Sequence, residues 1–282
     1  KKNFKFKLSN EKINLNLNDI FFTKTNNLPN FKYNDTNQII LKSKKLTRHN
    51  PSEYILFEQN HLIFSDDRGN IIIFSTEKNK VLTKFNFYKN KYKNIKKKLN
   101  LLIEKNIIFV SDNIGFLYAY DFKKETVIWA KNYKTPFRSN LKLLDSKIVA
   151  ASQNNDLFFF DKKTGEIVKK LPTEATIIKN QFINNLSCDD NSLFFINTYG
   201  TLYSINRNNL KVNWFLNLNQ SIDLNPSNLF FGNEIVMDKN KVVVSANQFT
   251  YVIDSNTGKL LSKKNFHIKH RPLIFKDYLF LI

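Results

Sequence analysis

The stretch Ile108-Phe-Val-Ser-Asp-Asn-Ile-Gly-Phe-Leu-Tyr-Ala-Tyr-Asp121 decides the fold. Two apolar runs stand on either side of a polar turn that ends at Gly115. A tight hairpin turn needs a residue with a positive φ angle, and glycine adopts that angle without steric cost. The stretch therefore predicts two antiparallel strands, Ile107–Ser111 and Phe116–Tyr120.

The same pattern of strand, turn and strand recurs in four other parts of the chain. Glycine occupies the turn position in three of the five repeats, and Asn155 or Gln248 occupies it in the others. The steps between successive repeats are 46, 40, 45 and 48 residues. This period is too long for one turn of a β-solenoid and indicates a unit of several strands. The positions that define the repeat are Gly69, Gly115, Gly200, Ser75, Asp121, Asp161, Asn206 and Asp254.

Each repeat continues into a second polar turn and a third strand. Asp161-Lys-Lys-Thr-Gly165 and Asp254-Ser-Asn-Thr-Gly258 have the composition of turns, because the carboxylate can accept hydrogen bonds from backbone amides two residues further on. A fourth strand is expected in the stretch between repeats. The predicted third strands are Val127–Lys131, Glu166–Lys170 and Lys259–Lys263, and the predicted fourth strands lie in Phe137–Leu144 and Pro272–Phe275.

Four strands in each repeat, with little helix, predict an all-β protein: a β-propeller of four-stranded blades. The apolar runs Leu157–Phe160 and Leu193–Ile196 are expected to be inner strands covered on both faces. Five blades are recognisable in residues 51–282, and a sixth is expected to begin at Tyr278. We expect a fragment of a ring of seven or eight blades. A β-sandwich or a solenoid is the structural alternative.

Residues 1–50 are expected to be an N-terminal extension, or strands of a partial blade together with a loop. Phe4–Leu8 and Ile13–Leu17 alternate apolar and polar residues, as half-exposed strands do. Asn26–Asn37 has the composition of a loop. The chain begins at Lys1 without a methionine and ends at Ile282 inside an apolar run, so we interpret it as cut at both ends.

The chain carries a net charge of +20, from 44 Lys and Arg against 24 Asp and Glu. The lysines are spread along the sequence, and the densest group is Lys89–Lys98. A solvated loop is one interpretation of this group, and a surface for phosphate or anionic lipid is the other. No zinc finger, helix-turn-helix or aromatic RNA-binding motif accompanies it, so we expect no nucleic-acid partner.

Few residues suggest catalysis or a cofactor. Cys188 is the only cysteine and has no glycine elbow or histidine near it in sequence, so it is expected to be a small buried or turn residue. The adjacent acids Asp66-Asp67 and Asp189-Asp190 are expected to be solvated turn residues. We therefore expect no catalytic residue, no metal site and no cofactor.

The repeat resembles that of the quinoprotein-type (PQQ-like) propellers. Ala119-Tyr-Asp121 followed by Trp129, Asn206 followed by Trp214, and the two Thr-Gly turns at Gly165 and Gly258 carry the resemblance. Within this group the chain looks most like the BamB family, the outer-membrane protein assembly factors. The stretches that resemble this family are Thr135-Pro-Phe-Arg138, Gly200-Thr-Leu-Tyr-Ser-Ile205 and Arg271–Leu281.

The resemblance implies a non-enzymatic scaffold that assists the assembly and insertion of β-barrel proteins into the outer membrane of a Gram-negative bacterium. It implies a lipoprotein on the periplasmic side of that membrane, with a lipid anchor outside this chain. Its partners would be a BamA-like barrel-assembly protein and nascent outer-membrane proteins. The loop positions that would bind the partner are Ile178, Gln181, Asp223 and Asn225.

Two other functions are open at this point. Quinone-dependent dehydrogenases share the repeat, and they resemble one another in a calcium site on the ring axis. A basic surface that binds nucleic acid or anionic lipid is the second alternative. The tryptophans of such propellers dock neighbouring blades, but only two repeats here have one, so the packing is expected to rely on Phe and Tyr.

Overall fold

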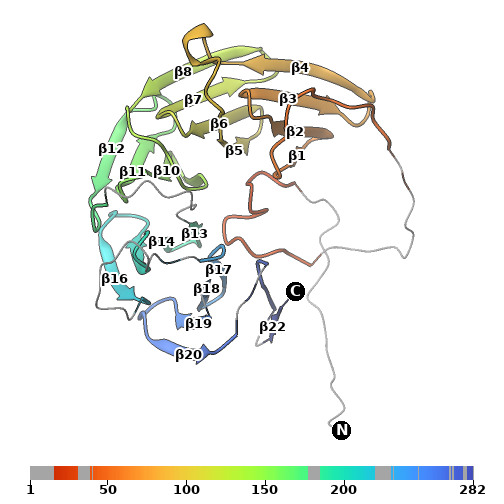
Figure 1. The fold of residues 1–282 in the computed structure, drawn as a ribbon. Helices are drawn as coiled ribbons and strands as arrows, with labels where there is room; N and C mark the ends of the chain where they lie inside the picture. Colours follow the sequence, from red (N-terminus) through yellow and green to blue (C-terminus); the bar gives the residue numbers. More distant parts are fainter. Residues whose placement is uncertain are drawn as a thin grey trace.

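Six antiparallel sheets stand around a common axis as the blades of a propeller (Figure 1). The computed structural model describes residues 16–30, 39, 41–176, 185–219, 230, 232–246, 248–266, 268, 270–275 and 278–281. Five of the sheets have four strands and the sixth has two. The predicted all-β propeller is therefore confirmed.

The strands follow one another from the axis to the rim within each blade. The first blade is β1 (Leu56–Glu58), β2 (His61–Ser65), β3 (Asn70–Ser75) and β4 (Lys80–Asn86), and a short 3-10 helix (Asn90–Tyr92) follows it. The second is β5 (Leu99–Glu104), β6 (Ile107–Asp112), β7 (Phe116–Asp121) and β8 (Thr126–Asn132), and the third is β9 (Lys142–Leu144), β10 (Lys147–Ala151), β11 (Leu157–Asp161) and β12 (Ile167–Leu171). The fourth is β13 (Leu186–Cys188), β14 (Ser192–Ile196), β15 (Thr201–Asn206) and β16 (Val212–Asn217), and the fifth is β17 (Val236–Asp238), β18 (Lys241–Ala246), β19 (Phe249–Asp254) and β20 (Leu260–Lys264). The sixth sheet holds β21 (Leu273–Phe275) and β22 (Tyr278–Phe280).

The apolar runs that we expected to be inner strands are the middle strands of their blades. Leu157–Phe160 lies in β11 and Leu193–Ile196 in β14, and another strand lies between each of them and the axis. The innermost strands are the short segments between repeats, such as β9 and β21. Middle strands are more apolar because a neighbouring blade covers each of their two faces.

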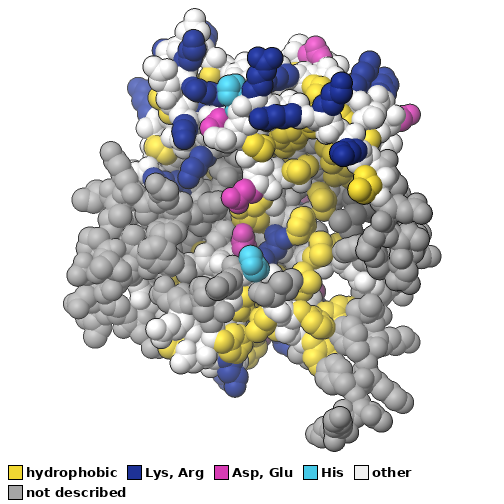
Figure 2. Space-filling model, turned by 45° about the vertical axis from the view of Figure 1, so that its right-hand side comes forward, with side chains coloured by type: hydrophobic (Ala, Val, Ile, Leu, Met, Phe, Trp, Pro, Cys, Tyr) yellow, Lys and Arg dark blue, Asp and Glu magenta, His cyan; other side chains and the backbone are white. Residues whose placement is uncertain are grey.

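The outermost strands have a different character. Their burial alternates between exposed and half-buried residues, and each keeps one hydrogen-bonding edge free of a sheet partner. Figure 2 shows Lys and Arg side chains gathered in the upper part of the view, where Figure 1 places the first and second blades. Charged side chains, and lysine in particular, discourage one exposed strand edge from pairing with another.

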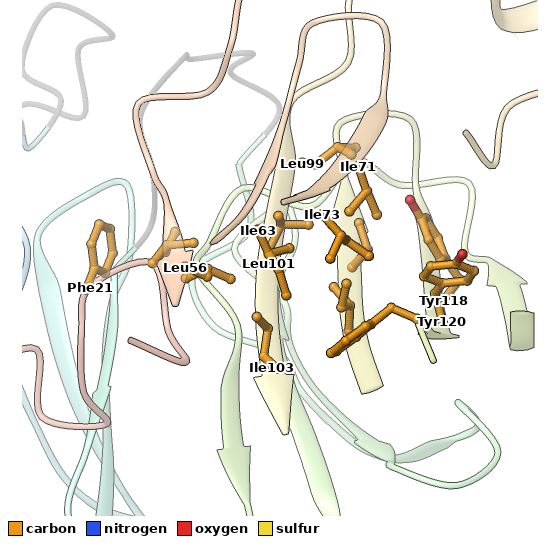
Figure 3. Close-up of a cluster of buried hydrophobic side chains, with 14 residues drawn as sticks. Phe21, Leu56, Ile63, Ile71, Ile73, Leu99, Leu101, Ile103, Tyr118 and Tyr120 are labelled. Atoms are coloured by element: carbon orange, nitrogen blue, oxygen red, sulfur yellow. The ribbon is translucent and has the colours of Figure 1, made fainter. Parts of the chain in front are cut away.

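Large aromatic and aliphatic side chains fill the space between the first two blades (Figure 3). Ile71 and Ile73 of β3 face Tyr118 and Tyr120 of β7, and all four are buried. Two rings from the first blade stack on those tyrosines: Phe85 lies 3.9 Å from Tyr120, and Phe87 lies 4.4 Å from Tyr118, between ring centres. Aromatic pairs of this kind add to the free energy gained from burial of their area.

The tryptophans connect one blade to the next at the rim. Trp129 of β8 donates its indole N–H to the carbonyl of Lys162 at 3.1 Å, in the third blade. Its ring lies on Gly165, where a Cβ atom would come within 2.5 Å of the ring. Trp214 of β16 makes the same contact with Gly258 of the fifth blade. A tryptophan of one blade and a glycine of the next thus form a pair across the contact between the two blades, which we call the joint.

Where the tryptophan is missing, the glycine is missing as well. Thr83 occupies the tryptophan position of the first blade and donates to the carboxylate of Glu125 at 2.6 Å. Lys169 occupies it in the third blade and donates to the carbonyl of Leu210 at 2.6 Å. Glu125 and Leu210 have φ angles of 55° and 56°, close to the glycine conformation. The backbone conformation of the turn is therefore the same at each of these joints, although the pair of side chains that meets there differs.

Replacement of Gly165 by alanine is expected to lower the free energy of unfolding by about 2–4 kcal/mol. The new Cβ must displace the Trp129 ring, and alanine also disfavours the φ of +74°. Glu125→Ala is the matched control, because that turn position already carries a Cβ and loses only the bond from Thr83, about 1 kcal/mol. Urea unfolding measures both variants. A loss at Gly165 no larger than that at Glu125 would contradict this account of the joint.

Two acids hold equivalent turns but have opposite pKa shifts. Asp66 and Asp112 each accept hydrogen bonds from backbone amides of the turn that follows them, and both are buried. The prediction that Asp66 is a solvated turn residue is therefore wrong. Burial raises the pKa of Asp112, although the Tyr88 hydroxyl donates to it at 2.5 Å. Burial also acts to raise the pKa of Asp66, but hydrogen bonds from Thr47, Asn70 and the turn amides outweigh it and lower that pKa.

Asp112→Asn and Asp66→Asn are expected to change the pH dependence of stability in opposite directions. The folded state binds the Asp112 proton more readily than the unfolded chain does, so the contribution of Asp112 declines as pH rises above about 4. The contribution of Asp66 is present above that pH and is lost as pH falls through the lower folded pKa. Urea titrations of each variant and the parent between about pH 3 and pH 7 measure the difference. Slopes of the same sign would contradict the assignment.

Candidate functional site along the ring axis

A single segment, residues 16–30, runs through the centre of the ring (Figure 1). The innermost strand of every blade has one edge that no sheet partner covers. Such an edge presents backbone N–H and C=O groups that need hydrogen-bond partners when they are buried. The segment supplies partners to the blades one after another.

The segment first pairs with the blades nearest to it in sequence. The backbone of Leu17 exchanges two hydrogen bonds with Phe57 of β1, at 2.8 and 3.0 Å. The carbonyl of Asn18 accepts from the amide of Ile103 of β5 at 2.8 Å. Asp19 forms an isolated bridge with Leu102 of the same strand. These contacts fix the start of the segment against the first two blades.

The segment then reaches the blades that are farthest from it in sequence. The carbonyls of Lys24 and Thr25 accept from the amides of Cys188 and Met237, at 2.8 and 3.0 Å. The side chain of Asn27 both donates to and accepts from the backbone of Ile274, at 2.7 and 3.1 Å. These three partners belong to β13, β17 and β21. One short segment therefore contacts inner strands that span most of the chain.

Lys142 of β9 fastens the middle of the segment. Its ammonium group donates to the carboxylate of Asp19 at 2.6 Å, the carbonyl of Thr23 at 2.9 Å and the amide oxygen of Asn26 at 2.5 Å. The lysine side chain is 0% exposed and that of Asp19 is 6% exposed. A lysine ammonium has three donors, and all three have an acceptor here. This satisfies a charge that would otherwise be too costly to bury.

Asn26 links two further blades from the same position. Its side-chain amide donates to the carbonyls of Leu186 at 2.9 Å and Ile235 at 2.7 Å. Asn26 is fully buried and has a φ angle of 58°, a left-handed conformation that asparagine tolerates. Its oxygen points to Lys142 while its nitrogen points to the fourth and fifth blades. Asn26 therefore links the third, fourth and fifth blades at the axis.

Arg271 packs against the axial segment. Its guanidinium carbon lies 4.2 Å from the ring centre of Phe22, and burial lowers the pKa of the arginine. Tyr54 meets the ring of Phe21 edge-on at 5.6 Å. Burial raises the pKa of Tyr54 to about 12, and the nearby carboxylate of Glu234 adds to this effect. Aromatic and charged groups from both ends of the described chain therefore meet at this point.

The predicted partner-binding positions Ile178, Gln181, Asp223 and Asn225 lie outside the described residues. The described stems of their two loops converge on one turn of the fourth blade. Glu174 accepts from the side chain of Asn197 at 2.7 Å, and the amide of Phe230 donates to the carbonyl of Thr198 at 3.1 Å. The ring of Phe230 lies on Gly200, in the same turn.

The described residues contain no group of three or more His, Cys, Asp or Glu side chains placed to hold a metal ion. Cys188 is buried in β13, and burial raises the pKa of its thiol to about 11. Within the described ranges, no helix is long and apolar enough to cross a membrane. Asp19, Asn26 and Lys142, the residues that organise the axis, were not among the predicted site residues.

Lys142→Met is expected to lower the free energy of unfolding by about 3–5 kcal/mol, because it leaves the Asp19 carboxylate buried without a counter-charge. The double variant Lys142→Met/Asp19→Leu is expected to recover part of this loss. Trypsin cleavage after Lys24 should also become faster as the segment detaches. Lys163→Met, at an exposed turn, is the control and should change stability by less than about 0.5 kcal/mol. If the substitutions at Lys142 and Lys163 change the free energy of unfolding by the same amount, the ion pair does not hold the segment.

No protein-family model matches the chain, and no curated protein matches it in sequence. Among solved structures, the fold is similar to that of BamB from Moraxella catarrhalis, with a TM-score of 0.65 and 11% sequence identity. That likeness covers 80% of this chain and 67% of the other. The fold is also similar to the computationally designed Ika8 protein, with a TM-score of 0.62 and 17% identity, over 79% of this chain and 64% of that one. The resemblance to BamB that the repeat residues suggested is thus confirmed at the level of the fold.

Proposed function

We propose that this protein is a non-enzymatic scaffold that assists the assembly and insertion of β-barrel proteins into the outer membrane, on the periplasmic side. The partners would be a BamA-like barrel-assembly protein and the nascent outer-membrane proteins themselves. The likeness of the fold to BamB supports this proposal. A rigid ring with loops at one end is also suited to binding other proteins, because loops carry function on such scaffolds.

The observation that carries the proposal is the filled axis. Quinone-dependent dehydrogenases, the rival suggested by the repeat, would hold calcium on this axis. Here the chain's own segment lies along the inner strands, and the buried ammonium of Lys142 provides the cation that faces Asp19. A carboxylate already paired with an ammonium is a poor calcium ligand, since calcium requires several free oxygen ligands. The residues on the axis therefore do not fit a calcium ion.

The arrangement of the loop stems gives further support. The described stem of the loop that contains Ile178 and Gln181 and the described stem of the loop that contains Asp223 and Asn225 both contact the turn at Asn197–Gly200. Loops with adjacent stems can present one continuous surface to a partner. Such a surface would combine apolar, amide and acidic side chains, which suits a mixed protein interface.

Co-purification of the full-length protein from native envelopes, after mild crosslinking, tests this function. We expect mass spectrometry to identify the barrel-insertion protein among the partners. The variant Gln181→Ala/Asp223→Ala should reduce its recovery about tenfold or more, which corresponds to a loss near 1.4 kcal/mol.

The matched control is Glu77→Ala/Asn208→Ala, which removes one carboxylate and one amide from exposed turns at the other end of the blades. This control should leave recovery unchanged. Absence of the barrel-insertion protein from the wild-type sample would overturn the proposal. Equal recovery with both variants would move the contact away from these loops.

A further inference from the structure

The positive charge of the chain is highest in residues 41–98, which comprise the segment that leads into the first blade, the first blade and the loop that follows it. Residues 41–98 contain fourteen Lys and Arg and five Asp and Glu, a surplus of nine out of the total of twenty. Residues 186–235, which include the fourth blade, contain two basic and four acidic residues. Six of the fourteen basic residues belong to Lys89–Lys98, the group that the sequence marks as densest. Figure 2 shows the basic side chains together in the upper part of that view.

A cleft of about 400 Å³ lies in this basic region, between the segment 42–46 and the beginning of β4. Four lysines line it: Lys42, Lys44, Lys45 and Lys80. All four are exposed, so their ammonium groups can reach a ligand from solvent. The buried ring of Phe74 and the side chain of Val81 contribute apolar lining. A volume of this size lies within the usual range for small-molecule sites, about 300–1,000 Å³.

The lysines of the cleft have no acidic partner among the described residues. Every ion pair found there involves Lys24, Lys131, Lys142, Lys162, Lys170 or Arg207, and none involves residues 41–98. Glu77 lies in the turn before Lys80, but it does not line the cleft. Four unpaired cations around one cleft repel each other, and an anion between them would remove that repulsion.

The group that looked densest in sequence, Lys89–Lys98, is arranged less favourably for a ligand. Lys97 is turned inward, where it is buried, donates to the carbonyl of Tyr92 at 2.5 Å and lies 5.3 Å from the ring centre of Tyr88. Burial lowers the pKa of Lys97. One of these lysines therefore supports its own loop and is not available to a ligand.

We propose that the cleft lined by Lys42, Lys44, Lys45 and Lys80 binds a phosphate-bearing anion. Lysine ammonium groups are compact point charges that bind phosphate without the planar geometry that arginine requires. Four of them match the multiple negative charge of a polyphosphate, or of the headgroup of an anionic phospholipid. The apolar contribution of Phe74 and Val81 also accommodates the non-polar part of an amphiphile.

Two probes distinguish the sources of the phosphate. Vesicles of phosphatidylglycerol in phosphatidylcholine present it as a headgroup, and inorganic tripolyphosphate presents it free in solution. Binding of the full chain is measured at about 0.1 M salt, where charges more than ~10 Å apart are largely screened. Phosphatidylcholine vesicles are the blank. We expect binding to at least one probe, with an affinity that falls as the salt concentration rises.

The decisive comparison uses two variants with the same net charge. The cleft variant is Lys42→Gln/Lys44→Gln/Lys45→Gln/Lys80→Gln, and the control is Lys123→Gln/Lys163→Gln/Lys211→Gln/Lys259→Gln, at exposed positions of the second to fifth blades. The cleft variant should raise Kd about tenfold or more, since each lysine at an anionic surface contributes roughly fivefold. The control should change Kd by less than about twofold.

Each outcome either supports the cleft as an anion-binding site or excludes it. Selective loss with vesicles alone assigns a lipid headgroup, selective loss with tripolyphosphate alone assigns a free phosphate, and loss with both assigns the shared group. If the two variants weaken binding equally, the chain binds anions through its total charge and the cleft is not a site. Failure of both probes to bind the unmodified chain would also overturn the proposal.

Discussion

The inner strands of the propeller each leave an edge of backbone N–H and C=O groups toward the axis, and these groups need partners. Residues 17–27 provide them, with Lys142 and Asn26 as the central fastening points. The arrangement depends on the buried pair of Lys142 and Asp19, because each charge is tolerated inside the ring only in the presence of the other. The positions of all six blades around the axis are therefore linked to one short segment.

The blades are held at the rim by a second set of contacts, between an outer strand and a turn of the next blade. Trp129 with Gly165 and Thr83 with Glu125 show that this joint can be built from a ring or from a hydrogen bond. Contacts at two distances from the axis restrict both the tilt and the spacing of a blade. A ring with only two tryptophans can therefore keep the geometry of a propeller.

The strands and turns could be predicted because their signals are local. Gly115 and Asp121 lie within a few residues of the backbone groups that they organise. The axial segment could not be predicted, since Asn27 and its partner Ile274 are 247 residues apart and the segment has no apolar period. One signal was present: Lys142 stands among three leucines, where a charge calls for a buried partner. The partner-loop positions lie outside the described residues, so those assignments stay predictions.

The lysine cleft and the described stems of the two predicted partner loops lie at opposite ends of the blades. In an antiparallel four-stranded blade, the turn between the second and third strands lies at the same end as the connection to the next blade. The described stems at residues 172–176 and 218–219 begin such connections, after β12 and β16. The lysine cleft adjoins the turn between β3 and β4, which lies at the other end. An anion held in the cleft would therefore leave the loop end free for a protein partner, because the length of the blades separates the two.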